Sequence, residues 1–206
     1  MKKNMFLTKR NFMQQKKLYI FLTVFSIIAI ISGILFYFIL SDTDKKTSMD
    51  LIDNFFKTLH SNKNLNYFSS LLSSLTNNIS FSLIIWTLGI SIIGLPIIVI
   101  LLFFRCFVLG FSISSIIAKY GLKGILKAFL YVFPHQLILI IILMLLSFYA
   151  VSFCIKLFKY LFLKEQINFK EAMRKYIKIL AITIIANIFL SLYETYIATY
   201  LIRLLS

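Results

Sequence analysis

The chain carries an unbroken apolar run at residues 18–40, with the sequence LYIFLTVFSIIAIISGILFYFIL. The run is 23 residues long, whereas about 20 apolar residues let a helix cross a hydrocarbon core about 30 Å thick. A secretory signal peptide has a shorter apolar region, of about 7–15 residues, followed by a small-residue cleavage site. This run instead ends in Ile-Leu-Ser-Asp at 39–42. We therefore predict that residues 18–40 form a retained membrane-spanning helix.

The composition of the whole chain is also typical of a membrane protein. Of its 206 residues, 60% are hydrophobic and only 14% are charged. A soluble domain has about 45–50% apolar and about 25% charged residues. These proportions exclude a soluble globular enzyme, a disordered chain and a small disulfide scaffold. We predict an all-α, polytopic integral membrane protein with five transmembrane helices, which forms a single membrane domain over residues 1–206.

The net charge of +15 is concentrated in two parts of the chain. Residues 1–17 contain six basic residues and no acid, and residues 156–178 contain seven basic residues and two acids. Because basic segments tend to stay on the cytoplasmic side of a membrane, we expect a cytoplasmic N-terminus and a cytoplasmic loop at 156–178. Four spans before that loop and a fifth after it satisfy both expectations, the cytoplasmic N-terminus and the cytoplasmic loop. The charge then acts as a topology signal, and no nucleic-acid partner is expected.

Residues 41–78 form the expected outer loop, in which four acidic and four basic residues balance. Apolar residues recur in this loop at helical spacing, first at Ile52, Phe55, Phe56 and Leu59, and then at Leu65, Phe68, Leu72 and Leu75. We predict two short amphipathic helices. They would lie on the outer interface or against the bundle, or else they would form a surface on which a partner docks.

Residues 79–155 are expected to contain spans 2–4. The first part of this block is too long for one span and suits two. We place the inner end of this helical hairpin at Arg105, because a guanidinium at mid-bilayer would cost several kcal/mol unless it snorkelled or paired. Gly89, Gly94 and Pro96 are expected to loosen the first helix of the hairpin.

Small residues occupy every fourth position in the segment that follows, at Gly110, Ser114 and Ala118. Such spacing lets two helices approach closely and pack by van der Waals contact. The partner helix could belong to the same chain or to a second copy in a homo-oligomer, and the spacing does not distinguish the two. A connector with three lysines follows at 119–127, and five spans place it on the outer side.

The last span, expected at 179–201, contains the one acidic residue of the apolar segments, Glu194. An intramembrane carboxylate is costly and is by default a functional-site hypothesis. Glu194 lies seven residues before the outer end of its span, and His135, which follows Pro134, lies seven residues after the outer start of span 4. Because these depths match, we predict a contact between His135 and Glu194.

Two further polar residues, Gln136 and Asn187, are expected to join this intramembrane cluster. Two roles for the cluster stay open. A protonated, hydrogen-bonded Glu194 could simply hold helices together. Alternatively, Glu194 and His135 could carry protons or bind a substrate, which would make the protein a small transporter or a permease-like subunit.

The sequence contains no motif that favours catalysis. It has no nucleotide-binding loop, Rossmann glycine pattern, HExxH zinc motif or GxSxG nucleophile elbow. Two histidines cannot form a metal site by themselves, and both cysteines lie in apolar segments, where they act as small hydrophobic residues. We therefore expect no catalytic residue, no metal and no cofactor.

The region from Gly89 to Ile142 resembles a known family. It contains Gly-x4-Gly-x-Pro from Gly89, then LLFFRCFVLGF at 101–111, a glycine-containing connector and FPHQLILI at 133–140. These motifs are similar to the glycine-rich hairpin, and to the Pro-His opening of the next helix, in the stage II sporulation protein M family of bacterial membrane proteins. Tyr-Glu-Thr at 193–195 resembles the acidic motif near the end of that family's last helix.

The resemblance implies a role in endospore formation, in the engulfment of the forespore by the mother cell. Family members hold the peptidoglycan-degrading stage II sporulation proteins D and P at the septal membrane. The resemblance therefore implies a non-catalytic anchor and scaffold in the bacterial cell membrane, surrounded by membrane lipid, whose outer loop and outer helix ends contact these partners. A housekeeping role in the envelope, outside sporulation, stays open as an alternative.

Overall fold

The computed structural model describes residues 2–61, 67–127, 133–164, 168–198 and 200. Within these ranges the chain is helical and contains no β-strand. Five of the described helices are long and apolar enough to cross a membrane, so the prediction of an all-α polytopic membrane protein with five spans is confirmed. They are α1 (Lys2–Ile39), α3 (Tyr67–Gly89), α4 (Gly94–Tyr120), α6 (Phe133–Phe162) and α7 (Phe169–Leu192).

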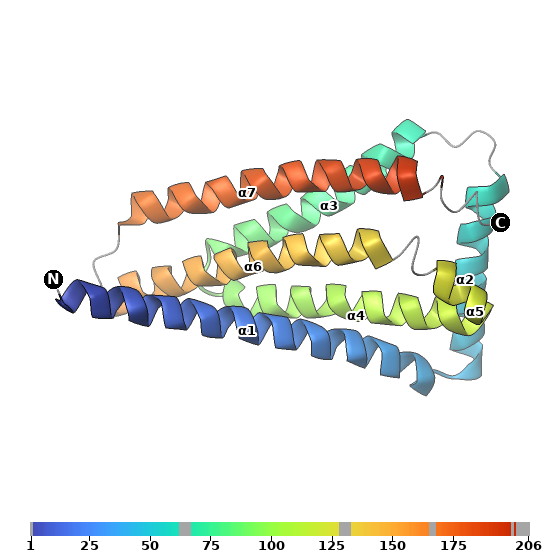
Figure 1. Ribbon diagram of the computed structural model, residues 1–206, viewed down its shortest axis with the longest axis horizontal. Helices are drawn as coiled ribbons and strands as arrows, with labels where there is room; N and C mark the ends of the chain where they lie inside the picture. The colour runs from blue at the N-terminus through green and yellow to red at the C-terminus, as the bar shows by residue number, and fades with distance from the viewer. Residues whose placement is uncertain (1, 62–66, 128–132, 165–167, 199, 201–206) are drawn as a thin grey trace.

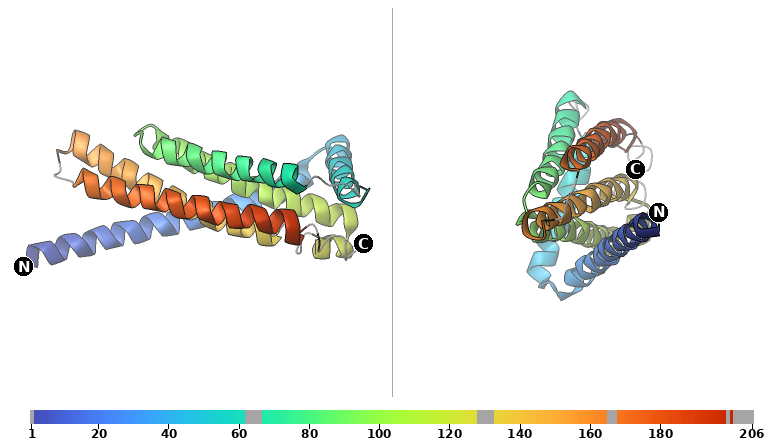
Figure 2. Two further views of the ribbon diagram at one scale, coloured as in Figure 1. Left: turned by 90° about the horizontal axis from the view of Figure 1, so that it is seen from above. Right: turned by 90° about the vertical axis from the view of Figure 1, so that its left-hand side faces the viewer.

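The five spanning helices run in alternating directions along one elongated bundle (Figures 1 and 2). Helix α1 begins at the end of the bundle where α3 is followed by α4 and α6 by α7, and we call this the basic end. The short helices α2 (Asp42–Ser61) and α5 (Leu122–Lys127) lie at the opposite end, which we call the α2 end (Figure 1). The two most basic parts of the sequence therefore lie at the same end of the bundle.

The hairpin between the second and third spans turns at residues 90–93, and the prediction that it turns at Arg105 is wrong. Helix α4 continues without interruption through Arg105. The turn is closed by backbone hydrogen bonds, from the N–H of Ser91 to the carbonyl of Leu88 at 3.0 Å and from the N–H of Gly94 to the carbonyl of Ser91 at 3.1 Å. Arg105 therefore does not mark the turn between the second and third spans.

Gly89, Gly94 and Pro96 border this turn, so the prediction that they loosen a single helix is also wrong. A Cβ on Gly94 would overlap the backbone carbonyl of Leu88, so the tight turn requires glycine there. Pro96 lies in the first turn of α4, where the backbone N–H groups have no partner within the helix and the missing N–H of proline costs nothing. These residues separate two helices.

Helix α3 begins at Tyr67 rather than at residue 79. The second of the two amphipathic helices predicted for 41–78 is therefore the first part of a spanning helix. The first of them is present as α2, a 20-residue helix. It lies across the end of the bundle, nearly perpendicular to the spanning helices (Figure 1).

Most of the basic segment 156–178 is helical, because α6 continues to Phe162 and α7 begins at Phe169. The start of α7 is fixed by an N-cap, in which the side chain of Asn168 accepts a hydrogen bond from the backbone N–H of Glu171 at 3.2 Å. At its other end α7 passes into a π-helix, η2 (Tyr193–Ala198). The basic residues therefore extend both helices beyond the apolar spans.

The small residues of α4 pack against α1 of the same chain. A Cβ on Gly110 would overlap the backbone carbonyl of Ile30, and a Cβ on Gly33 would overlap the backbone carbonyl of Phe107. Ser114 continues this buried face, whereas Ala118 is exposed. The partner of the small-residue stripe is therefore internal, and the close approach is reciprocal, with one glycine on each helix.

Aromatic rings fill the bundle interior near the basic end. The ring of Tyr176 in α7 stacks between Phe153 of α6, at a centroid distance of 4.8 Å, and Trp86 of α3, at 5.5 Å. The Tyr176 hydroxyl donates a hydrogen bond of 2.8 Å to the carbonyl of Trp86. Gly89 leaves the space that this hydroxyl occupies. These contacts join α3, α6 and α7 at one depth.

Candidate functional site

Polar side chains line the interface between α3 and α7. On α3 they recur at every fourth position, which places them on one face of the helix. They meet a polar face of α7 and its π-helical extension. We call this set the polar ladder, and it consists of Ser74, Asn78 and Ser82 on α3 with Asn187, Ser191 and Glu194 opposite.

The part of the polar ladder nearer the middle of the bundle is centred on Asn187, whose side chain is 0% exposed. Its amide N–H groups donate to the hydroxyl of Ser82 at 2.8 Å and to the backbone carbonyl of Asn78 at 3.4 Å. The Ser82 hydroxyl in turn donates to the same Asn78 carbonyl at 2.9 Å. A polar group inside a membrane bundle is stabilised by such interhelical hydrogen bonds.

The part of the polar ladder nearer the α2 end leads to the carboxylate of Glu194. The side-chain amide of Asn78 donates to the hydroxyl oxygens of Ser74 and Ser191, each at 3.4 Å. The Ser74 and Ser191 oxygens lie 3.2 Å apart. The Ser74 hydroxyl donates a hydrogen bond to the Glu194 carboxylate. The amide and hydroxyl groups thus form a continuous chain of polar contacts from Ser82 to Glu194.

The contact predicted between His135 and Glu194 is present. The imidazole Nε2 of His135 lies 3.3 Å from a carboxylate oxygen of Glu194, and the histidine side chain is only 6% exposed. His135 comes from the first turn of α6, so the contact ties a third helix to the polar ladder. Glu194 itself lies on the π-helix η2, and π-helical turns occur frequently at functional sites.

Arg105 approaches the same cluster from α4. Its guanidinium carbon lies 5.6 Å from the centre of the Phe81 ring on α3, a cation–π distance. It also lies within electrostatic range of Glu194 and His135. Its buried Nε has no hydrogen-bond partner among the described residues. The guanidinium therefore lies against an aromatic face and within the electrostatic influence of a carboxylate.

Gln136 was expected to join this cluster, but among the described residues no hydrogen bond connects it, and Pro134 and Thr183 have roles outside the cluster. Pro134 is in the first turn of α6, a position that suits proline. Gln136 is half-buried, and it makes no side-chain hydrogen bond within the described part of the chain. Thr183, which shares a face of α7 with Asn187, donates to the carbonyl of Ile179 in its own helix at 2.9 Å.

The α3 half of the polar ladder was not anticipated from the sequence. Ser74 and Asn78 were assigned to the outer loop, because polar residues lower the local hydropathy in the same way inside a bundle as they do in a loop. The signal that would have found them is their spacing. Ser74, Asn78 and Ser82 are each four residues apart and lead into the buried Ile85 and Gly89, which is the pattern of one helix face.

At the α2 end, the short helix α2 is fastened to α4 through Asp53. Its carboxylate accepts a 2.7 Å hydrogen bond from the hydroxyl of Tyr120 and lies 3.1 Å from the ammonium of Lys119. Lys119 is the first of the three lysines in the connector at 119–127. Its ion pair shows how an acid of α2 balances positive charge at this end of the bundle.

The polar contacts of this site join helices. Among the described residues, no group of three or more histidine, cysteine, aspartate and glutamate side chains comes together. The polar ladder, with His135 and Arg105, links α3, α4, α6 and α7 through hydrogen bonds and charge. Such contacts specify which helix faces meet in a medium where apolar burial does not.

A five-span helical bundle with a buried polar ladder and a transverse helix at one end defines a small multi-pass membrane protein. The chain matches the family model for stage II sporulation protein M over residues 21–199. It therefore belongs to the stage II sporulation protein M family, as its glycine and Pro-His motifs indicate. Comparisons with curated proteins and with solved structures found no match.

Proposed function

We propose that the protein is a non-catalytic membrane anchor for peptidoglycan-degrading partners, stage II sporulation proteins D and P, at the septal membrane during engulfment. Membership of the stage II sporulation protein M family supports a role in sporulation. The observation that carries the anchoring role is the attachment of α2 to α4, through the contacts of Asp53 with Lys119 and Tyr120. These contacts fix a helix across the end of the bundle, where a partner outside the lipid can reach it.

The proposal places the α2 end on the outer face of the cell membrane. The start of α1, the end of α6 and the start of α7 lie at the opposite end of the bundle (Figure 1), and all three are basic in sequence. Basic segments favour the cytoplasmic side. With that orientation, α2 faces the side on which peptidoglycan lies.

The exposed face of α2 is the proposed contact surface for the partner. Leu51 is 66% exposed although it is apolar, and the acidic Asp50 beside it is exposed too. Asp53 faces the bundle instead, through its bonds to α4. The side of α2 that carries Asp53 therefore contacts α4, and the side that carries Leu51 is available to a partner.

The test is co-purification of proteins D and P with the full-length protein from membranes of sporulating cells. Leu51→Asp should lower the recovered partner by about tenfold, because a charge in a protein interface is costly to desolvate. The matched control is Leu163→Asp, a leucine of similar exposure at the basic end, which should leave recovery unchanged. Failure of both partners to co-purify with the unaltered protein would contradict the proposal.

A transport function is the second candidate, and the 3.3 Å contact between His135 and Glu194 is the observation that favours it. It predicts proton or solute flux in vesicles that contain the purified protein alone. Such flux should then be lost in Glu194→Gln. The anchor proposal predicts no difference in flux between these vesicles and protein-free vesicles.

A further inference from the structure

A pocket opens between α6 and α7 near the basic end of the bundle, away from the polar ladder. Its volume is about 360 Å³, within the range of about 300–1,000 Å³ that is typical of small-molecule sites. Its walls combine aromatic and polar side chains, among them Phe148, Tyr149, Ser152, Lys156, Lys175 and Tyr176. Phe148 also packs edge-on against Tyr19, so α1 borders the same region.

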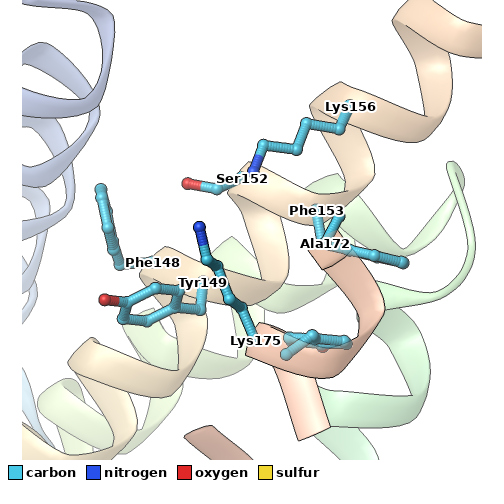
Figure 3. A pocket seen from close by; sticks show the side chains of 8 residues that line it. Phe148, Tyr149, Ser152, Phe153, Lys156, Ala172 and Lys175 are labelled. Carbon is cyan, nitrogen blue, oxygen red and sulfur yellow. The ribbon is translucent and has the colours of Figure 1, made fainter. Parts of the chain in front are cut away.

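The polar groups of the pocket converge from two helices. Figure 3 shows the side chains of Lys156 on α6 and Lys175 on α7 both extending toward Ser152. The Ser152 hydroxyl oxygen is buried and has no hydrogen-bond partner among the described residues. Lys175 is also paired with Glu171 at 2.8 Å, so the two lysines and this acid leave one net positive charge. An anion is the ligand that two ammonium groups and a free hydroxyl can bind together.

The depth of the pocket matches the boundary of the membrane. Lys156 is the first charged residue after the apolar run of α6, and Lys178 is the last one before the apolar run of α7. The pocket therefore lies where the apolar spans meet the basic end, which is the level of lipid headgroups. Basic pockets between transmembrane helices are suited to acidic headgroups.

The surface on the membrane side of the pocket is apolar and open to lipid. Leu145 lies about two helical turns from Ser152 toward the bundle centre and is 41% exposed, and Ile182 on α7 is 57% exposed. A ligand that placed an anion between the two lysines would find apolar contact for hydrocarbon along the same two helices. A free inorganic anion would leave that surface unused.

We propose that this pocket binds the phosphate headgroup of an anionic phospholipid. The phosphate lies between Lys156, Lys175 and the Ser152 hydroxyl, and the acyl chains follow α6 and α7 into the membrane. The site is independent of the partner proteins and of the anchoring role, because its residues lie at the end of the bundle opposite α2.

The test uses the full-length protein in nanodiscs or detergent, with lipid binding measured by native mass spectrometry. Phosphatidylglycerol should be retained in preference to phosphatidylcholine. The double variant Lys156→Gln with Lys175→Gln should lower the affinity for phosphatidylglycerol by about tenfold. Ser152→Ala should lower it less, because the hydroxyl contributes one neutral hydrogen bond. Inorganic phosphate should not compete at the same concentration.

The control double variant, Lys159→Gln with Lys164→Gln, removes the same charge from the same end of the bundle without altering the pocket lining. It should retain the preference for phosphatidylglycerol. An equal loss in this control would overturn the proposal, since the preference would then follow net charge. Equal retention of phosphatidylcholine, or full competition by inorganic phosphate, would also overturn it.

Discussion

At the scale of single residues, Asn187 carries the bonds between α3 and α7 that are most deeply buried. Asn187→Leu keeps a similar size but removes the donors to Ser82 and to the Asn78 carbonyl. We expect a loss of about 1–2 kcal/mol in the free energy of unfolding, measured by denaturant titration in micelles. Thr183→Val is the control, because Thr183 is equally buried but bonds to Ile179 of its own helix. Equal losses in the two variants would contradict an interhelical role for Asn187.

His135 and Glu194 provide the second test at this scale. If their contact stabilises the bundle, a double-mutant cycle with His135→Ala and Glu194→Ala should give a coupling energy between about 0.6 kcal/mol, the average for polar contacts between membrane helices, and about 1.7 kcal/mol, the largest found. The exchange of His135→Glu with Glu194→His should recover part of the stability that each single variant loses. A coupling energy of zero, with no recovery on exchange, would show that the two side chains do not act as a pair.

At the scale of helices, the close approach of α1 and α4 depends on glycine. Gly110→Leu places a side chain where the backbone of Ile30 lies, and it should destabilise the folded protein by about 1–3 kcal/mol or more. Ala118→Leu, at the exposed end of the same small-residue stripe, should be tolerated. Thermal unfolding in detergent measures both. A tolerated Gly110→Leu would mean that the two helices do not pack as closely as described.

The sequence predicted the number of spanning helices better than it predicted their ends. Apolar length, together with the placement of the two basic segments, identified five spans. The turn at 90–93 was not predicted. A charged residue such as Arg105 lowers the local hydropathy in the same way at the end of a helix and inside a bundle, where other helices surround it. The outer half of α3 was missed for the same reason, since Asn78 is polar in sequence yet 3% exposed in the bundle. The contact of His135 with Glu194 was predictable because depth can be counted along each helix.

At the scale of the whole molecule, the orientation in the membrane can be measured directly. Thr47 on α2 and Lys164 at the basic end are both exposed, and the native Cys106 and Cys154 are both buried. With the native cysteines replaced by serine, Thr47→Cys should react with a membrane-impermeant maleimide in intact cells. Lys164→Cys should react only after permeabilisation. The reverse pattern would invert the proposed orientation and remove α2 from the peptidoglycan side.

The most direct test of the anchoring role is site-specific photo-crosslinking in cells that are undergoing engulfment. A photoreactive residue at position 51, on the exposed face of α2, should capture stage II sporulation protein D or P. The same residue at position 163, at the opposite end of the bundle, should capture neither. If position 51 captured neither protein, or if position 163 captured them equally, the proposal that α2 presents these partners at the membrane would be contradicted.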